Sequence, residues 1–262
     1  MAKPKALILR TAGTNCDVES AFACEQAGFT ADRVHVNRIA DGGVGFDDYS
    51  FLFIPGGFSY GDDIAAGRIL ALELNRRLGD ALLEFEDAGK LVLGVCNGFQ
   101  VLIKTGFMPF HTKSPAEMRA TLTDNDSGRF EDRWVHLTVE RGSPCVFTRK
   151  TPERIELPVA HGEGKFIVKD PADLQELERD GQVVFRYTAP DGGEPSYPAD
   201  PNGSMNHIAG VCNKQGTIMG LMPHPERFLH RTNHPRWTRG NRPEEGDGMA
   251  FFRNAYEYCS KM

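Results

Sequence analysis

The stretch from Lys90 to Gln100, KLVLGVCNGFQ, constrains the fold more than any other part of the chain. An apolar β-type run, Leu91 to Val95, passes without a linker into a helix-compatible segment that begins near Phe99. A strand that turns directly into a helix leaves the residue between them strained, and flanking glycines are needed because the chain crosses itself with no room for a Cβ. The sequence therefore predicts a nucleophile elbow with Cys96 at the carboxyl end of a strand.

This position favours reactivity of the Cys96 sulfur. The unpaired N–H groups and the dipole of a helix N-terminus favour a thiolate over a thiol, and the thiolate is the nucleophile in acyl transfer. Free cysteine is also among the most buried residue types, so the motif alone leaves a packing role open. A partner base elsewhere in the chain would favour catalysis.

The first hundred residues alternate strands with helices. We expect strands over residues 5–10, 33–39, 50–54 and 91–95, and helices over 17–26, 64–88 with a possible break near Gly79, and 99–104. The helix over 17–26 is expected to end at Gly28 and to turn Val18, Ala21, Phe22 and Cys24 inward, and Cys16 and Cys24 are interpreted as packing or loop thiols. Such alternation indicates an α/β fold with a parallel sheet.

Beyond residue 106 short strands follow one another. Residues 134–139, 158–161, 164–168 and 182–187 have few helical segments between them, which indicates an antiparallel extension of the same sheet. Residues 191–206 are expected to form a loop, and residues 208–212 and 217–221 a final hairpin. We expect a single domain over residues 1–262, with residues 230–262 as a C-terminal extension.

The third predicted strand ends in Pro55-Gly56-Gly57. Two glycines directly after a buried strand leave backbone N–H groups unobstructed, as an oxyanion hole requires. A plain turn that needs positive φ explains the pair equally well. A phosphate-binding loop is excluded because the Walker spacing, with its Lys and Ser or Thr, is missing.

A candidate base lies in the segment Met222-Pro-His-Pro-Glu226, directly after the final hairpin. The two prolines keep the chain out of a helix, so His224 and Glu226 are expected two apart on an extended chain, with side chains toward the same face. A carboxylate there can bind one imidazole nitrogen and leave the other for a thiol. Taken alone, a histidine in a proline-rich loop is more often simply exposed.

The three signals together, in this order along the chain, resemble the class I, or triad, glutamine amidotransferases. Within that class the sequence motifs over residues 5–230 resemble those of the glutaminase components of phosphoribosylformylglycinamidine synthase. The motifs that carry the resemblance are GTNCD (13–17), PGGFSYGD (55–62), GVCNGFQ (94–100), HGEG (161–164), YPADPNG (197–203) and MPHPER (222–227). The tail, with Trp237 and the FRNA motif over 252–255, resembles the end of the large fused form more than a free-standing subunit.

The resemblance implies a flavodoxin-like, mostly parallel sheet with helices on both faces. It implies a triad of Cys96, His224 and Glu226, in which the thiolate attacks the side-chain carboxamide of glutamine. The N–H groups of Gly57 and Asn97 would hold the tetrahedral oxyanion. The implied substrate-binding residues are Gln100, Phe58, His161, Gly162 and Glu163.

The implied partner is a synthetase that receives the ammonia, possibly with a small accessory subunit. The chain carries no pattern for an acyl-phosphate step, so ATP and Mg²⁺ are expected on the synthetase and no cofactor or metal here. Phe58, Tyr60 and Asp62 are candidates to face this partner, and Asp17, Asp62 and Asp63 could contact a metal or a partner, although lone acidic loop residues are usually solvated.

Composition excludes several other classes. The net charge of −6 argues against nucleic acid as the main partner, despite an arginine-rich stretch over residues 227–242. No apolar run approaches the length of a membrane span, and the N-terminus lacks the apolar core of a signal peptide. The six cysteines show no CxxC pair, which favours reduced thiols and a cytoplasmic location.

Three alternatives stay open at this point. The chain could be the glutaminase of another class I amidotransferase, a stand-alone cysteine hydrolase that uses Cys96 and His224, or a non-catalytic regulatory module that kept the fold.

Overall fold

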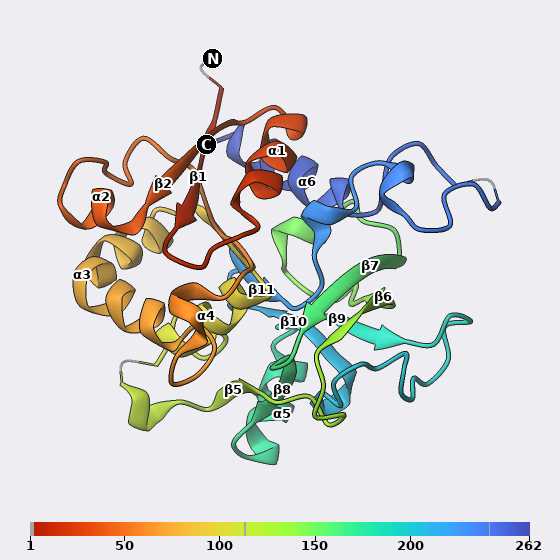
Figure 1. The fold of residues 1–262 in the computed structure, drawn as a ribbon. Helices are drawn as coiled ribbons and strands as arrows, with labels where there is room; N and C mark the ends of the chain where they lie inside the picture. The colour runs from red at the N-terminus through yellow and green to blue at the C-terminus, as the bar shows by residue number, and fades with distance from the viewer. Residues whose placement is uncertain (1–2, 113, 241) are drawn as a thin grey trace.

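The computed structural model describes residues 3–112, 114–240 and 242–262 (Figure 1). A nine-stranded sheet in the order β2-β1-β3-β4-β11-β10-β9-β6-β7 forms its centre, and β5 and β8 form a separate two-stranded sheet. The strands are β1 (Lys5–Arg10), β2 (Thr30–His35), β3 (Phe51–Ile54), β4 (Leu91–Val95), β5 (Ala120–Thr123), β6 (Glu131–Val139), β7 (Arg154–His161), β8 (Lys165–Val168), β9 (Val183–Thr188), β10 (Ile208–Cys212) and β11 (Ile218–Leu221).

One half of the large sheet is parallel. β1 pairs in parallel with β2 and β3, β3 with β4, and β4 with β11, in a register that places Ile54 beside Gly94 and Leu221 beside Val95. β1, β3, β4 and β11 are short apolar runs without polar alternation, as expected where helices cover both faces, whereas the edge strand β2 is polar and largely exposed. Their carboxyl ends therefore meet along one edge of the sheet.

The other half is antiparallel. β10 pairs with β11 and with β9, and β6 lies between β9 and β7. β11, the last strand in the sequence, therefore returns to the parallel half, where it lies between β4 and β10. The expected α/β fold, with a mostly parallel sheet and an antiparallel extension, is confirmed.

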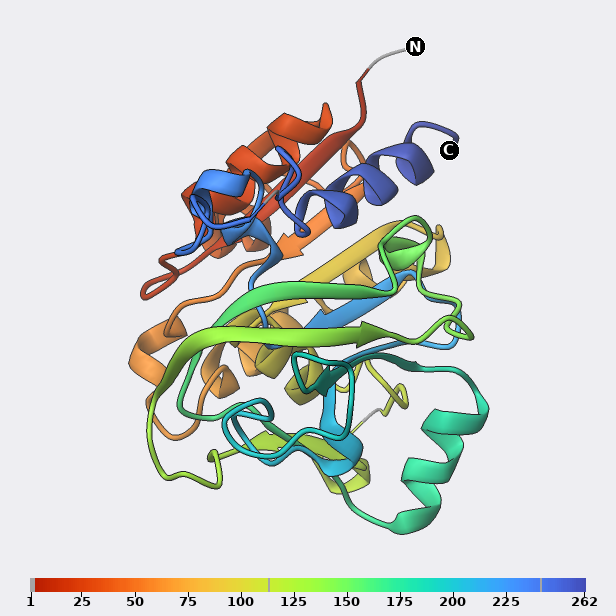
Figure 2. The same ribbon diagram turned by 90° about the vertical axis from the view of Figure 1, so that its right-hand side faces the viewer.

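Helices cover both faces of the parallel half. The helices are α1 (Asp17–Ala27), α2 (Val36–Ala40), α3 (Arg68–Asp87), α4 (Asn97–Thr105), α5 (Pro171–Arg179) and α6 (Met249–Cys259). α1 and α6 pack together on one face, and α3 and α4 pack on the other (Figure 2). Alternate residues of β3 follow this division, since Phe53 contacts Phe252 of α6 while Ile54 lies near Leu74 of α3.

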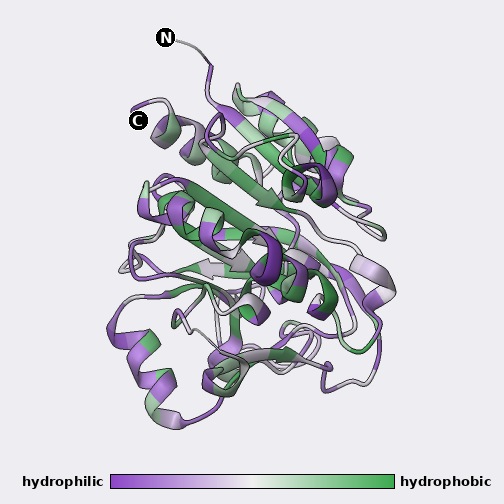
Figure 3. Cartoon of the chain, turned by 90° about the vertical axis from the view of Figure 1, so that its left-hand side faces the viewer, coloured by the Kyte–Doolittle hydropathy of each residue, from purple (hydrophilic) through white to green (hydrophobic). Residues whose placement is uncertain are grey.

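The core lies between these layers. The inner strands of the parallel half are coloured mainly hydrophobic, whereas the helices show hydrophilic outer sides (Figure 3). Phe51, Phe53, Phe99, Phe251 and Phe252 are completely buried. The apolar strand residues thus hold the sheet in a fixed frame, and the polar groups of the site sit at its edge. Within the described residues, no helix is long and apolar enough to cross a membrane.

The structure corrects several details of the expected elements. Val18 and Phe22 of α1 are exposed, by 60% and 45%, because α6 covers only part of this helix, while Ala21 and Cys24 are buried as expected. The strand expected over 33–39 runs from Thr30 to His35 and is followed by α2. α3 continues through Gly79 without a break.

Two further differences lie in the second half of the chain. The strand expected at 164–168 does not extend the main sheet, because β8 pairs instead with β5, a strand that was not expected. α5 was not expected at all, although Asp170 and Asp173 form a capping box at its start and Pro171 occupies its first turn.

Candidate active site

The candidate residues lie at the carboxyl ends of three neighbouring parallel strands. Gly57 follows β3, Cys96 follows β4 and His224 follows β11, and these strands are adjacent in the order β3-β4-β11. Side chains that are far apart in the sequence therefore meet at one edge of the sheet. Ligands of open α/β sheets bind in this kind of crevice.

The elbow is present as predicted. Cys96 stands between β4 and α4 with φ 52° and ψ −109°, a strained conformation for a residue with a side chain. A Cβ at Gly94 would lie 2.6 Å from the carbonyl oxygen of Gly98, and one at Gly98 would overlap the carbonyl oxygen of Ile54. Both glycines are therefore required by the close approach of the chain to itself.

His224 and Glu226 form a buried pair. The Nδ1 atom of His224 lies 2.7 Å from Oε1 of Glu226, and both side chains are almost completely shielded from solvent. His224 is extended as expected, and its N–H donates to the carbonyl of Pro158 at 2.8 Å. The chain does not remain extended, because Pro225–Arg227 form a short 3₁₀ turn, and this turn places the Glu226 carboxylate beside the ring.

The imidazole and the thiol meet above Gly56. A Cβ at this glycine would lie 2.8 Å from Cε1 of His224 and 3.4 Å from Cβ of Cys96, so the position has no room for a side chain. Within the described residues, Nε2 of His224 has no hydrogen-bond partner that meets standard geometry. Burial opposes protonation of His224, but the Glu226 carboxylate and the Cys96 sulfur raise its pKa well above the ordinary value. The site therefore favours an imidazolium at His224, beside the Cys96 sulfur.

The backbone N–H groups of Gly57 and Asn97 are the candidates for the oxyanion hole. Asn97 is the first residue of α4, a position whose N–H has no partner inside the helix. At the end of β3 the N–H of Cys16 donates to Gly56 and the N–H of Phe58 to Gly13, at 3.3 and 2.9 Å, and these bonds fix the turn on both sides of Gly57. This arrangement suits the stabilisation of an oxyanion.

A cavity of about 140 Å³ opens beside Cys96. Its walls hold all the residues that the sequence analysis named for substrate binding, together with Asp62, Ala66, Phe130 and Ala160. Phe58 and Phe130 are half exposed and stack at its rim with ring centres 6.4 Å apart. The amide of Gln100 is hydrogen-bonded at both ends, from Asn97 Nδ2 at 3.0 Å and to the carbonyl of Glu163 at 2.5 Å.

His161 has a defined tautomer. Its Nδ1 lies 3.1 Å from Oδ1 of Asn125, and the N–H of Gly164 donates to the same oxygen, so this atom acts as an acceptor and Nδ1 carries the proton. Burial and the nearby His224 lower the pKa of His161 to about 4. The ring is therefore neutral at pH 7, and its Nε2 is an acceptor without a partner among the described residues.

Cys16 belongs to the site, although the sequence analysis interpreted it as a packing or loop thiol. Its sulfur lies beside His224 and accepts a hydrogen bond from Nη2 of Arg227 at 3.0 Å. Burial raises the pKa of this thiol, so it stays protonated at neutral pH. One signal could have identified it, because Cys16 follows the turn after β1, and β1 ends at the same sheet edge as β3.

One group of potential metal ligands was found among the described residues. A ligand atom each of Cys16, His224 and Glu226 lie within 4.8 Å of one another. Two of these three residues are the proposed base and its orienting carboxylate, already joined by a hydrogen bond. A metal ion bound here would coordinate the His224 imidazole and so prevent it from acting as a base.

Comparison with known proteins agrees with this geometry. The family model of the CobB/CobQ-like glutamine amidotransferase domain matches residues 3–259. The chain belongs to this glutamine amidotransferase family. It is 45% identical to the phosphoribosylformylglycinamidine synthase subunit PurQ of Dehalococcoides mccartyi, with all of both chains covered, and 40% identical to the subunit of that name from Methanococcus maripaludis, with 98% of both covered.

The fold of this amidotransferase also matches solved structures. One chain of the structure of PurLQS from Thermotoga maritima is 31% identical, with 98% of this chain and 99% of that chain covered and a TM-score of 0.75. The alignment with the Dehalococcoides subunit includes the tail beyond residue 230. The tail thus occurs in a relative named as a separate subunit, which corrects the expectation that it resembles the end of the large fused form more than a free-standing subunit.

Proposed function

We propose that this chain is the glutaminase subunit of phosphoribosylformylglycinamidine synthase. In this role it releases ammonia from glutamine for a synthetase subunit. That subunit uses ATP and Mg²⁺ to convert formylglycinamide ribonucleotide to formylglycinamidine ribonucleotide, in the cytoplasm. Membership of the amidotransferase family and full-length similarity to PurQ subunits support the assignment. The observation that carries it is the convergence of Cys96, His224 and Gly57 at three adjacent strand ends.

The reaction begins with the Cys96 thiolate, which attacks the side-chain carboxamide of glutamine. The N–H groups of Gly57 and Asn97 hold the oxyanion, and the loss of one such donor costs about 2.7–4 kcal/mol of barrier. The His224 imidazolium gives its proton to the leaving ammonia and a thioester remains. His224, now neutral, takes a proton from the water that hydrolyses the thioester, while Glu226 keeps Nδ1–H in place.

Ammonia that escapes into water is protonated and lost as a nucleophile. A glutaminase of this type is therefore useful only when it is docked on its synthetase, and we expect little activity from the isolated chain. We propose that the synthetase, with or without a small accessory subunit, receives ammonia by a protected path.

Ammonia release tests the proposal. It should be slow for the chain alone, rise when synthetase and its ligands are added, and disappear in Cys96→Ala. The variant Cys259→Ser, whose buried sulfur lies on α6 away from the site, is the matched control. Hydrolysis of peptides that lack glutamine, or full glutamine hydrolysis by Cys96→Ala, would contradict the assignment.

A further inference from the structure

Glutamine has two ends, and the groups around Cys96 act on only one of them. The triad and the oxyanion donors recognise a carboxamide, which many simple amides also carry. The other end of glutamine carries an α-ammonium group, and a buried cation requires an anionic or accepting partner. Two acidic residues, Asp62 and Glu163, are among the residues that line the cavity.

Asp62 lines the cavity, and only one of its carboxylate oxygens is engaged in the hydrogen bonds found among the described residues. It ends the short helix η1 (Ser59–Asp62) after β3, and its Oδ1 accepts hydrogen bonds from Asn97 Nδ2 at 2.9 Å and from the N–H of Gly67 at 3.2 Å. Both bonds use the same oxygen, so the carboxylate is fixed in direction while Oδ2 remains available. Partial burial and the nearby Glu163 raise the pKa of Asp62 above its ordinary value. A cation at Oδ2 would relieve this cost.

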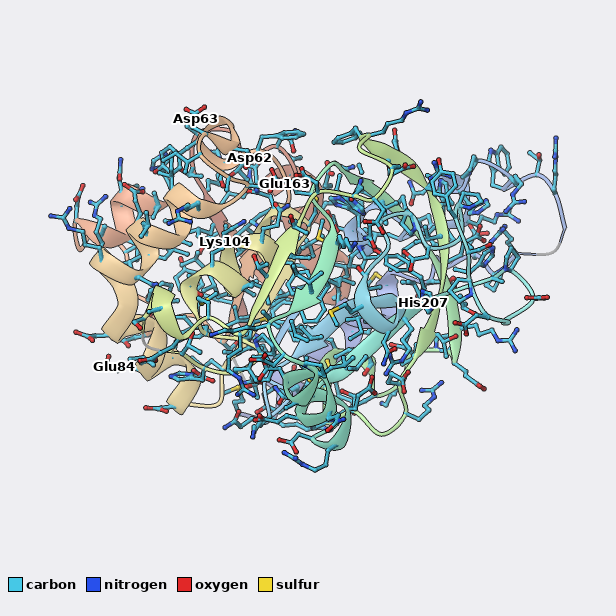
Figure 4. The ribbon with its side chains drawn as sticks, turned by 90° about the horizontal axis from the view of Figure 1, so that it is seen from below. Asp62, Asp63, Glu84, Lys104, Glu163 and His207 are labelled. Atoms are coloured by element: carbon cyan, nitrogen blue, oxygen red, sulfur yellow. The ribbon has the colours of Figure 1, made fainter. Side chains whose placement is uncertain are left out.

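Glu163 lies close to Asp62 from a different part of the chain. It follows β7, and its backbone carbonyl is held by Nε2 of Gln100 at 2.5 Å. Figure 4 shows Asp62 and Glu163 near one another, with Lys104 deeper on the same side of the molecule and Asp63 at the outer edge. Two carboxylates from separate loops thus meet at one cavity wall.

The charge balance also fits one cation. Lys104 interacts with both carboxylates, but its Nζ donates to the carbonyl of Ala66 at 2.6 Å and it does not line the cavity. The cluster of Asp62, Glu163 and Lys104 therefore carries one net negative charge when all three groups are ionised. In the zwitterionic glutamine, the α-ammonium group is the end that this charge attracts.

We propose that Asp62 and Glu163 form the subsite that binds the α-ammonium group of glutamine and selects an amino acid over a simple amide. This inference rests on the proposed function, because it assumes that glutamine is the substrate. Asp62 and Glu163 are then specificity-determining residues, while Lys104 positions them and limits their mutual repulsion.

The test compares two substrates in the complex with the synthetase. Glutaramate, the monoamide of glutaric acid, keeps the carboxamide and the carboxylate of glutamine but lacks its α-amino group. We expect Asp62→Asn to lower kcat/KM for glutamine about 10-fold to 100-fold and to change kcat/KM for glutaramate by less than about 3-fold, since a hydrogen bond to a charged group is lost in one case only. Where glutaramate turns over too slowly, its inhibition constant gives the same comparison.

Matched variants separate this role from a structural one. Asp62→Asn keeps the Oδ1 acceptor for Asn97 and Gly67, and Asp63→Asn, an exposed neighbour, should leave both substrates unchanged. Glu163→Gln should lower the preference for glutamine in the same direction, which provides a second variant if Asp62→Asn folds poorly. Equal losses for both substrates in both variants, or no loss in either, would overturn the subsite.

The proposed function can fail separately. If the wild-type complex hydrolyses neither substrate, the glutaminase assignment is wrong and the subsite falls with it. If the wild-type complex hydrolyses glutamine but its preference over glutaramate does not depend on Asp62 or Glu163, only the subsite is wrong.

Discussion

At the scale of single residues, the surroundings of two buried histidines favour opposite protonation states. His224 is favoured as a charged imidazolium and His161 as a neutral imidazole. His224 and His161 are both buried, and burial alone disfavours a charged imidazole in each. Only His224 has a carboxylate at hydrogen-bond distance from its ring, whereas His161 faces the neutral amide of Asn125. One ring is therefore prepared for proton transfer and the other for accepting a hydrogen bond.

Replacing Glu226 by Gln tests the first of these roles. The change removes the carboxylate that raises the pKa of His224, so the imidazolium should lose its proton at lower pH than in the wild type. We expect glutamine hydrolysis to fall roughly 100-fold, within the usual range for general acid–base catalysis. The pH dependence of Cys96 alkylation by iodoacetamide measures the shift. Glu244→Gln, on an exposed carboxylate, serves as control, and an unchanged profile in Glu226→Gln would contradict the role.

His161 should make the protein sensitive to acid. Its pKa is about 4 in the folded chain against 6.5 as the reference value, so the unfolded chain binds more protons between these pH values. The free energy of unfolding should therefore fall as pH decreases from about 6.5 to about 4, by roughly 3 kcal/mol from this group. Urea unfolding of wild type and His161→Gln across this range isolates the effect. Parallel pH profiles for the two proteins would show that His161 does not cause it.

The sequence could predict that Cys96, His224 and Glu226 come together, because each stands in a motif with its own local geometry. Cys96 lies between glycines that permit an elbow, and His224 lies between prolines that forbid a helix. Cys16 has no such motif, and its role appears only when β1 and β3 are placed side by side. The same holds for Asp62, whose fixed oxygen depends on Asn97 from the next strand end.

At the scale of elements, close approach of backbones decides which glycines matter. Gly98 lies against the carbonyl of Ile54, whereas the position of a Cβ at Gly79 in α3 has nothing within 4 Å. Local patterns therefore predicted the elbow well, but they also raised a false expectation of a break in α3. The pairing of β8 with β5 could not be predicted either, since alternation shows that a strand exists but not its partner.

Two Gly→Ala changes should consequently have opposite effects on the free energy of unfolding. Gly98→Ala forces a methyl group into the Ile54 carbonyl and should lower the free energy of unfolding by about 3 kcal/mol, the upper end of overpacking costs. Gly79→Ala should raise it by about 0.5–1 kcal/mol, because it removes backbone freedom from an open helical position. Urea denaturation of both variants measures the pair. If both variants changed the free energy of unfolding in the same direction, close backbone contact would not be what distinguishes Gly98 from Gly79.

At the scale of the whole molecule, a carboxylate on β7 holds part of the arginine-rich stretch. Glu156 on β7 accepts hydrogen bonds from Arg236 at 3.1 Å and Arg242 at 2.9 Å, and His234 lies 3.1 Å away. Burial opposes ionisation of Glu156, but bonds from His234 and Arg242 hold its pKa below the ordinary value. The tail was unassigned from sequence because this partner lies in a distant strand.

Glu156→Gln should release the tail. Removing one partner of a largely buried ion pair is expected to cost about 3 kcal/mol of unfolding free energy, and the arginines of residues 231–242 should become accessible to trypsin. The rate of trypsin cleavage in this segment, followed by mass spectrometry, measures the release. Glu244→Gln, which breaks an exposed pair with Arg231, should change it little. Identical digestion of wild type and Glu156→Gln would contradict the anchor.

The late insertion of β11 into the middle of the sheet has a consequence during synthesis on the ribosome. A nascent chain that has emerged only as far as β10 already contains Cys96, the elbow and both acidic residues of the cavity wall, yet it lacks the strand that carries His224 beside them. Partly translated or prematurely terminated copies therefore hold the nucleophile without its base. Such fragments are not expected to hydrolyse glutamine, because the base reaches the nucleophile only after the last strand of the sheet has been synthesised.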